Sequence, residues 1–334
     1  MVAVAVTVLV AAGLTRYMVA MPGSSFADPL PPLDGDLVAL RDRLRVHVEM
    51  LGGEIGERSV WRPDALAAAA EYIEAAWRAA GYRVGRQAFT AAGREVVNLH
   101  VEIPGVARPD AVVVVGAHYD SVLGSPGAND NGSGVAALLE LAARLRHLAP
   151  AVTLRFVAFV NEEPPFFLTW DMGSRRYARR CREAGDRVEA MLSLETIGCY
   201  LDLPGSQRYP GPFRLLYPGT GNFVAFVGNL RSRALVRRCV GAFRRATRFP
   251  SEGAAPPGYL PGVFWSDHWA FWREGFAAVM VTDTAPFRYR YYHSVDDTPD
   301  KLNYDRMTRV VGGLGDVVTE LVGAPTPSFA HDTE

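Results

Sequence analysis

The sequence has few cysteines, no excess of charge of one sign and no apolar run long enough to span a bilayer alone. Cys181, Cys199 and Cys239 are too few and too far apart for a disulfide scaffold or a zinc ribbon, and any pairing between them stays open. The net charge of −1 argues against a nucleic-acid partner, because such proteins usually carry a basic excess. Internal repeats and low-complexity tracts are also absent from the sequence.

The most apolar stretch lies at the N-terminus, over residues 2–14, and is close to the length of a signal h-region. Residues 25–27 offer a small-x-small cleavage site, although no Lys or Arg precedes the run and Arg16 follows it. We expect residues 1–36 to form a signal or anchor segment and a linker. Export to the periplasm or exterior, or membrane attachment through residues 2–21, would follow. A mis-chosen start codon or a buried N-terminal strand are the alternatives.

The chain is rich enough in apolar residues, at 49%, to bury a sizeable core. Its organising stretch covers residues 112–134, where four valines predict a strand buried on both faces. A polar loop and a helix over residues 133–148 follow. Strand and helix patterns alternate on both sides of this stretch, so we predict an α/β fold with a mixed, mostly parallel central sheet and helices on both faces.

One domain is expected to cover residues 37–325, with a tail at 326–334. Residues 201–261 are unusually rich in proline and glycine around one helical stretch at 232–245, and we interpret them as an insertion between core strands. This segment directly follows a candidate site residue, Glu195, so it is expected to form a wall of the specificity pocket.

Candidate functional residues follow several predicted strands. They are His118, Asp120, Asp130, Glu162, Glu163, Glu195 and His293. Each alone has an ordinary explanation, such as a turn-forming Asp or a packed His. The carboxyl edge of a parallel sheet, however, would bring these loops into one crevice. Carboxylates gathered there would repel one another without a cation, so the pattern predicts a site for divalent metal.

Five ordered segments resemble the zinc-dependent aminopeptidases of peptidase family M28, of bacterial type, from about residue 40 onward. They are HYDSVLGSPGANDNGSG (118–134), NEEPPFF (161–167) with the Met-Gly-Ser at 172–174, SLETIGCY (193–200), SDHWAFW (266–272) and YYHSVDDTPDKL (291–302). The resemblance implies two Zn2+ per chain, N/O ligation only, and hydrolysis of the N-terminal bond of peptides with a free N-terminus.

The resemblance also assigns roles. Asp130 would bridge the metals, His118 and Glu195 would complete one ligand set, and Glu163 and His293 the other. Glu162 would be the general base for the metal-held water. Asp120 would accept a hydrogen bond from the His118 imidazole and orient it. Many family members have Asp where this chain has Glu195, so metal affinity or preference could differ.

Neighbouring residues have less specific interpretations. Tyr292 is a candidate oxyanion donor, and Phe166, Phe167, Phe264 and Trp265 are candidate pocket linings or packed aromatics. Asp267 and His268 are either a pair that supports the metal ligands or a helix N-cap with a packed His, and we favour the structural interpretation. Asp296 and Asp297 are expected to cap a turn.

Three rival functions remain open at this point. A glutaminyl-cyclase-like enzyme would use a single zinc, and a peptidase-like ectodomain would lack catalysis. The same two-metal chemistry would also serve a carboxypeptidase or an amidohydrolase. The sequence specifies neither the preferred N-terminal residue, nor the native metal, nor the oligomeric state.

Overall fold

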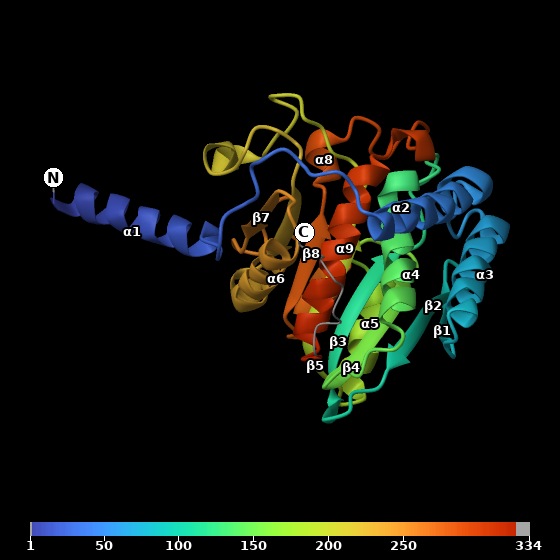
Figure 1. The fold of residues 1–334 in the computed structure, drawn as a ribbon. Coiled ribbons are helices and arrows are strands. Elements are labelled where there is room, and N and C mark those ends of the chain that lie inside the picture. The colour runs from blue at the N-terminus through green and yellow to red at the C-terminus, as the bar shows by residue number, and fades with distance from the viewer. Residues whose placement is uncertain (1, 325–334) are drawn as a thin grey trace.

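An eight-stranded mixed sheet forms the centre of the molecule in the computed structural model, which describes residues 2–324 (Figure 1). The strands are β1 (Gly85–Ala91), β2 (Arg94–Ile103), β3 (Arg108–His118), β4 (Val152–Phe159), β5 (Arg187–Glu195), β6 (Val224–Gly228), β7 (Ser251–Ala254) and β8 (Ala278–Thr282). Their order across the sheet is β1-β2-β4-β3-β5-β8-β6-β7. The central strands β4, β3, β5 and β8 run parallel to one another. On one side, β2 is antiparallel to both β4 and β1; on the other, β6 and β7 are parallel to each other, and β6 is antiparallel to β8. The predicted fold class is confirmed.

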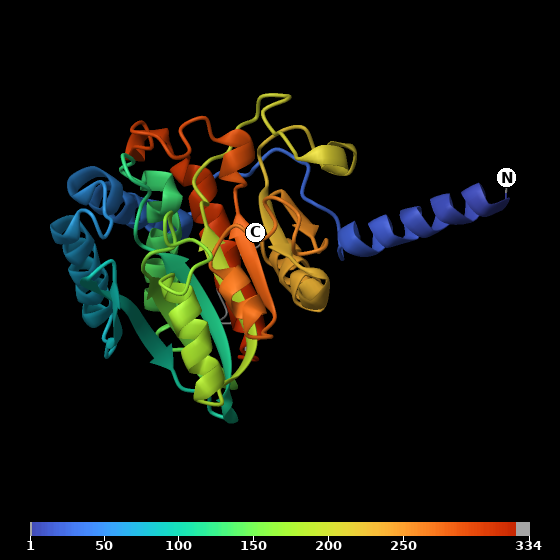
Figure 2. The same ribbon diagram turned by 180° about the vertical axis from the view of Figure 1, so that it is seen from behind.

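Helices cover both faces of this sheet (Figures 1 and 2). The α-helices of the described residues are α1 (Val2–Val19), α2 (Gly35–Val48), α3 (Pro63–Ala79), α4 (Gly134–Leu145), α5 (Gly173–Glu183), α6 (Arg233–Ala246), α7 (His268–Arg273), α8 (Ala285–Arg288) and α9 (Tyr304–Leu321). Helices α3, α4 and α6 pack on one face with α2 and α9 outside or between them, and α5 and α7 pack on the other. The parallel strands therefore lie buried between two helical layers.

Alternation along β3 divides the core into two parts. Val113 and Val115 belong to the large cluster beneath α4, whereas Val112 and Val114 belong to a smaller cluster with α5 and α7. All four valines are at most 1% exposed. A β-branched run suits this position because successive side chains point to opposite, equally buried faces. The predicted two-sided strand is confirmed.

The proline-rich segment at 201–261 is part of the sheet. It supplies β6 and β7 at one edge, and α6 packs against both strands. The sequence pattern showed only the helix, since β6 has five residues and β7 reads Ser-Glu-Gly-Ala. Both strands are defined by pairing with partners distant in sequence: β6 pairs with β8 and β7 with β6. The predicted insertion thus extends the sheet beside the metal-site candidates.

The N-terminal apolar run is helical and projects away from the body as α1 (Figures 1 and 2). Among residues 2–324, no helix combines the length and apolarity needed to cross a membrane. The end of α1 and the chain after it contact the β7 edge: the Ala255 N–H donates to Met18 O at 3.0 Å, and the Ser251 N–H donates to Ser25 Oγ at 2.9 Å. The predicted tail at 326–334 lies outside the described residues. All three cysteines are buried and free.

Candidate metal centre at the carboxyl edge of the sheet

The candidate residues lie where neighbouring parallel strands end. His118 is the last residue of β3 and Glu195 the last of β5. Glu162 and Glu163 follow β4, which lies on the other side of β3 from β5. The remaining two come from longer loops, Asp130 between β3 and α4 and His293 after α8. The parallel register places these segments at one edge, as the strand order requires.

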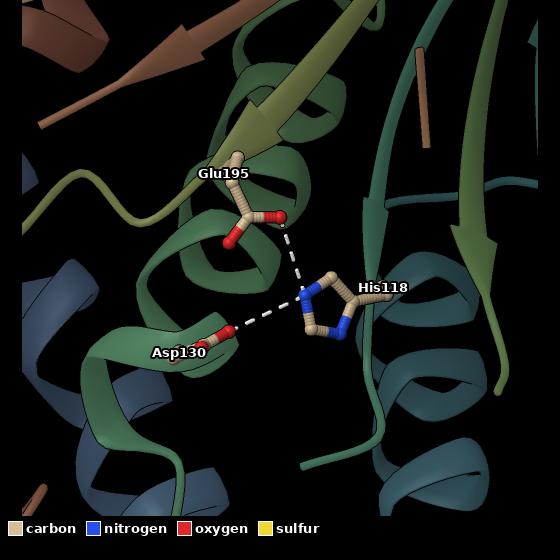
Figure 3. Close-up of side chains that lie close together, drawn as sticks. All are labelled: His118, Asp130 and Glu195. Atoms are coloured by element: carbon tan, nitrogen blue, oxygen red, sulfur yellow. Dashed lines mark ion pairs between the residues drawn. The ribbon is translucent and has the colours of Figure 1, made fainter. Parts of the chain in front are cut away.

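Three of these side chains converge on one point (Figure 3). His118 Nε2 lies 3.4 Å from Asp130 Oδ1 and 3.3 Å from Glu195 Oε2. One ligand atom from each of the three lies within 4.8 Å of the others, and all three residues are buried. One imidazole nitrogen and two carboxylate oxygens at this spacing form a donor set that a single small cation can bind.

A second group forms around the other oxygen of the same aspartate. His293 Nε2 lies 3.1 Å from Asp130 Oδ2 and 3.4 Å from Glu163 Oε2. These three residues also meet the 4.8 Å spacing, as does a further combination of His118, Glu162 and Glu163. The two oxygens of Asp130 thus face different histidines. Asp130 is the residue that the first two groups share.

The electrostatics of the cluster match a site for cations. Within residues 2–324, no hydrogen-bond partner reaches the buried atoms His118 Nε2 and Glu163 Oε1, an arrangement that costs free energy unless another group satisfies them. Burial raises the pKa of Glu162, Glu163 and Glu195 above its ordinary value. Burial opposes ionisation of Asp130 too, but the two imidazoles beside it, His118 and His293, lower its pKa. Imidazole and carboxylate donors without sulfur suit zinc, so the residues present fit the metal.

Asp120 has a different set of partners from the one expected. His118 Nδ1 is 3.2 Å from the main-chain oxygen of Asp120 and 3.5 Å from its carboxylate. The carboxylate instead accepts the backbone N–H groups of Glu162 and Glu163, each at 3.1 Å. Its main structural effect is therefore to fix the turn that carries both glutamates, in addition to lying beside the imidazole.

Two acidic residues beside the cluster, Asp297 and Asp267, differ from their interpretation in the sequence. Asp297, expected to cap a turn, is buried and accepts the backbone N–H groups of Asn129 at 2.9 Å and Asp130 at 3.1 Å. Asp267 makes no helix-capping hydrogen bond; it is fully buried, and burial raises its pKa to about 7. His268 packs edge-on against Trp272, in keeping with a structural role. Only the turn-like Asp-Asp sequence could have pointed to Asp297.

An apolar cavity of about 110 Å³ opens beside the cluster. Glu195 and Tyr292 lie at the metal-site end, and Tyr292 stacks on the His293 ring. The 201–261 segment supplies much of its wall, in keeping with its expected place in the pocket, through Tyr209, Phe213 and other residues. Of the four candidate aromatics, Trp265 lines the cavity, whereas Phe166 stacks on Trp61.

Comparison with known proteins identifies the family. A model of peptidase family M28 matches residues 98–318. A protein of Escherichia coli (strain K12), the uncharacterized protein YfbL, is 37% identical over 282 residues, which are 82% of this chain and 86% of that protein. The chain therefore belongs to peptidase family M28. It is a zinc-dependent exopeptidase.

Solved structures show the same fold at lower sequence identity. BSAP, a zinc aminopeptidase from Bacillus subtilis, matches with a TM-score of 0.66 at 16% identity, covering 87% of this chain and 96% of its own. A glutaminyl cyclase from Fimbriiglobus ruber matches with a TM-score of 0.60 at 21% identity, covering 90% and 99%. At these identities the matches establish the fold alone, and the site has to be argued from its own residues.

Proposed function

We propose that this chain is a co-catalytic two-zinc aminopeptidase that hydrolyses the N-terminal bond of peptides. The observation that carries the proposal is the shared aspartate: Asp130 presents one oxygen to His118 and the other to His293. Two donor groups that share one carboxylate are what a two-metal site requires. Glu195 would complete the first ligand set and Glu163 the second.

Zinc bound there would polarise the scissile carbonyl and acidify a water molecule. Glu162 is the residue of this chain placed to move the proton. Its Oε2 lies 3.9 Å from His118 Nε2, and Asp120 fixes its backbone through the Glu162 N–H. Glu162 would take a proton from the attacking water and deliver it to the leaving amine. The surrounding carboxylates would attract the free α-ammonium group of the peptide, and Tyr292, stacked on His293, would donate to the developing oxyanion.

The cyclase and the non-catalytic ectodomain would make less use of these residues. A cyclase with one working zinc would leave one of the two donor groups without a role. A non-catalytic ectodomain would need neither Glu162 nor a complete ligand set. All five proposed ligands and the proposed base are present together at the sheet edge, and this favours hydrolysis.

The test is zinc content measured together with hydrolysis of a leucine anilide, on the wild type, Glu162→Ala and the control Glu71→Ala. Glu71 is an exposed residue of α3, away from the cluster. We expect about two zinc ions per chain in all three proteins, and activity lost only in Glu162→Ala. One zinc per chain with cyclisation of N-terminal glutamine would establish the cyclase instead. Less than one zinc and no turnover of free-amine substrates would overturn both enzymatic readings.

We also propose that residues 2–21 direct export or membrane attachment and are retained on the protein. Three arginines of α6 bind the end of α1 and the chain that follows it: Arg233 stacks on Tyr17, Arg237 donates to Ala20 O, and Arg244 donates to Pro22 O. Retention is expected because cleavage after residue 27 would remove all of these contacts. N-terminal mass analysis after cell fractionation tests this, and a mature chain that starts at residue 28 would contradict it.

A further inference from the structure

The apolar cavity beside the metal-site candidates has a carboxylate at each end. Glu195 lies at one end and Glu252 of β7 is among the other lining residues. None of the described residues that line the cavity is a lysine, arginine or histidine. The hydroxyls of the lining residues Tyr209 and Tyr217 already donate to main-chain oxygens, those of Pro218 and Gly253. The walls are therefore apolar, and Glu252 is their only charged group besides Glu195.

Sheet register fixes the separation of the two carboxylates. Glu195 pairs with Thr282, Thr282 with Ala225, and Ala225 with Glu252, so the four residues form one row across β5, β8, β6 and β7. Directly paired residues point to the same face of a sheet. Three strand spacings of ~4.8 Å place the α-carbon of Glu252 about 14 Å from the α-carbon of Glu195, and side chains that point to the same face keep about this separation. Thr282 and Ala225, small side chains, form the floor between them.

The Glu252 carboxylate retains acceptor capacity. Arg244 Nη2 lies 3.9 Å away, beyond hydrogen-bonding distance, and its guanidinium donates to other oxygens: Ser251 Oγ, Ser251 O, Pro22 O and Gly23 O. One hydrogen bond reaches the carboxylate from the Ser25 hydroxyl. An ionised carboxylate offers about four acceptor positions, so a ligand cation can still be accommodated.

We propose that this cavity selects peptides whose N-terminal residue is lysine or arginine, with Glu252 as the specificity-determining residue. The inference rests on the proposed aminopeptidase function, which places the substrate α-carbon beside Glu195 and the metals. An extended lysine side chain reaches about 6 Å from its α-carbon. An ammonium–carboxylate contact adds about 3 Å, which leaves about 5 Å between the Glu195 carboxylate and the α-carbon. The side chain, the contact and this remaining gap together equal the separation of Glu195 and Glu252 across the sheet.

The wall chemistry suits such a side chain. The aliphatic stem of lysine or arginine packs on apolar surface while its charged end reaches a polar partner. Phe213 and Tyr217 line the cavity and offer aromatic faces to a cation. A glutamate side chain would extend towards the Glu252 carboxylate, and the lining contains no lysine, arginine or histidine to pair with it, so acidic N-terminal residues are expected to be rejected.

The test compares lysine anilide with norleucine anilide, which has nearly the same length without the charge. In Glu252→Gln we expect kcat/KM for the lysine substrate to fall about 10-fold, the size of one charge-assisted hydrogen bond, with norleucine changed less than about twofold. Glu71→Gln, the exposed control, should change neither. Glu252→Asp keeps the charge on a shorter side chain, so its preference should move towards arginine. An equal loss for both substrates in Glu252→Gln, or an unchanged ratio, would overturn the proposal.

A binding measurement separates this proposal from the proposed function. Lysine amide and norleucine amide are titrated into Glu162→Ala and into Glu162→Ala/Glu252→Gln by calorimetry. A preference for lysine amide that disappears in the double variant supports the cavity assignment, even if the wild type hydrolyses neither anilide and the aminopeptidase proposal fails. Equal affinities of Glu162→Ala for the two amides overturn the cavity assignment, even if both anilides are hydrolysed.

Discussion

Replacing Asp120 with asparagine tests how the two neighbouring glutamates of the cluster, Glu162 and Glu163, are held. The Asp120 carboxylate is 3% exposed and accepts two backbone N–H groups, Glu162 N at Oδ1 and Glu163 N at Oδ2. Asparagine has nearly the same shape, but one of its two terminal atoms is a donor. Whichever way the amide is turned, its NH2 group faces one of these N–H groups. One backbone donor therefore loses its acceptor.

The size of the effect follows from the burial of that donor. Glu162 and Glu163 are 7% and 4% exposed, so water cannot readily replace the lost acceptor. A buried donor left unsatisfied costs about 1–3 kcal/mol. The free energy of unfolding of metal-free Asp120→Asn should fall by this amount. Because the shifted glutamate is the proposed base or a proposed ligand, zinc affinity or kcat/KM should fall about 10- to 100-fold.

Urea denaturation, zinc competition with a chelator and kcat/KM on leucine anilide measure the three quantities. Asp110→Asn is the matched control, since it is the same substitution at the opposite end of β3. The Asp110 side chain is 61% exposed and pairs with Arg187 at 3.0 Å, so its loss should cost less than about 1 kcal/mol. If Asp120→Asn and Asp110→Asn behave alike in all three assays, the role assigned to Asp120 is wrong.

Two further predictions concern stability away from the reacting groups. Burial alone would raise the pKa of Glu140, but hydrogen bonds from His47 and Arg43 lower it below its usual value. Ionised Glu140 thus contributes stability above pH ~4.5 that is lost as pH falls through its lower folded pKa. Glu140→Gln should cost about 1.5–3 kcal/mol in urea denaturation at pH 7, and the difference from wild type should shrink below pH ~4; a pH-independent difference would contradict this. Arg58 is fully buried and donates to five backbone carbonyls, so Arg58→Met should lower unfolding free energy by at least about 3 kcal/mol, whereas a loss under 1 kcal/mol would show that water reaches those carbonyls.

The parts of the fold that the sequence predicts are those with strong local patterns. The valine run of β3 predicts a strand, and the spacing of apolar residues in α3 and α4 predicts two helices; the structure has all three. Pro63 at the start of α3 and Gly81 after its end, with φ +85°, mark that helix at both ends. The candidate site residues could be placed together because parallel strands end at one edge.

The remaining features depend on contacts between distant residues. β7 has four residues, among them a glycine and a glutamate, and only its pairing with β6 makes it a strand. Asp297 lies in a sequence typical of an exposed turn, yet it accepts hydrogen bonds from Asp130 and Asn129, which precede it in the chain by 167 and 168 positions. No local pattern contains such partners, so the sequence could name the proposed ligands but not the residues that position them.

Glu195 illustrates how the supporting residues accommodate a departure from the family pattern. Its side chain is one methylene longer than the Asp found in many members, so an unsupported carboxylate would have more freedom to move. Ser266 Oγ donates to Glu195 Oε2 at 2.7 Å and lies 2.8 Å from Ser193 Oγ. This hydroxyl pair holds Oε2 3.3 Å from His118 Nε2. The same residue begins the row that crosses the sheet to Glu252. Its position therefore links the proposed metal geometry to the proposed length of the substrate side chain.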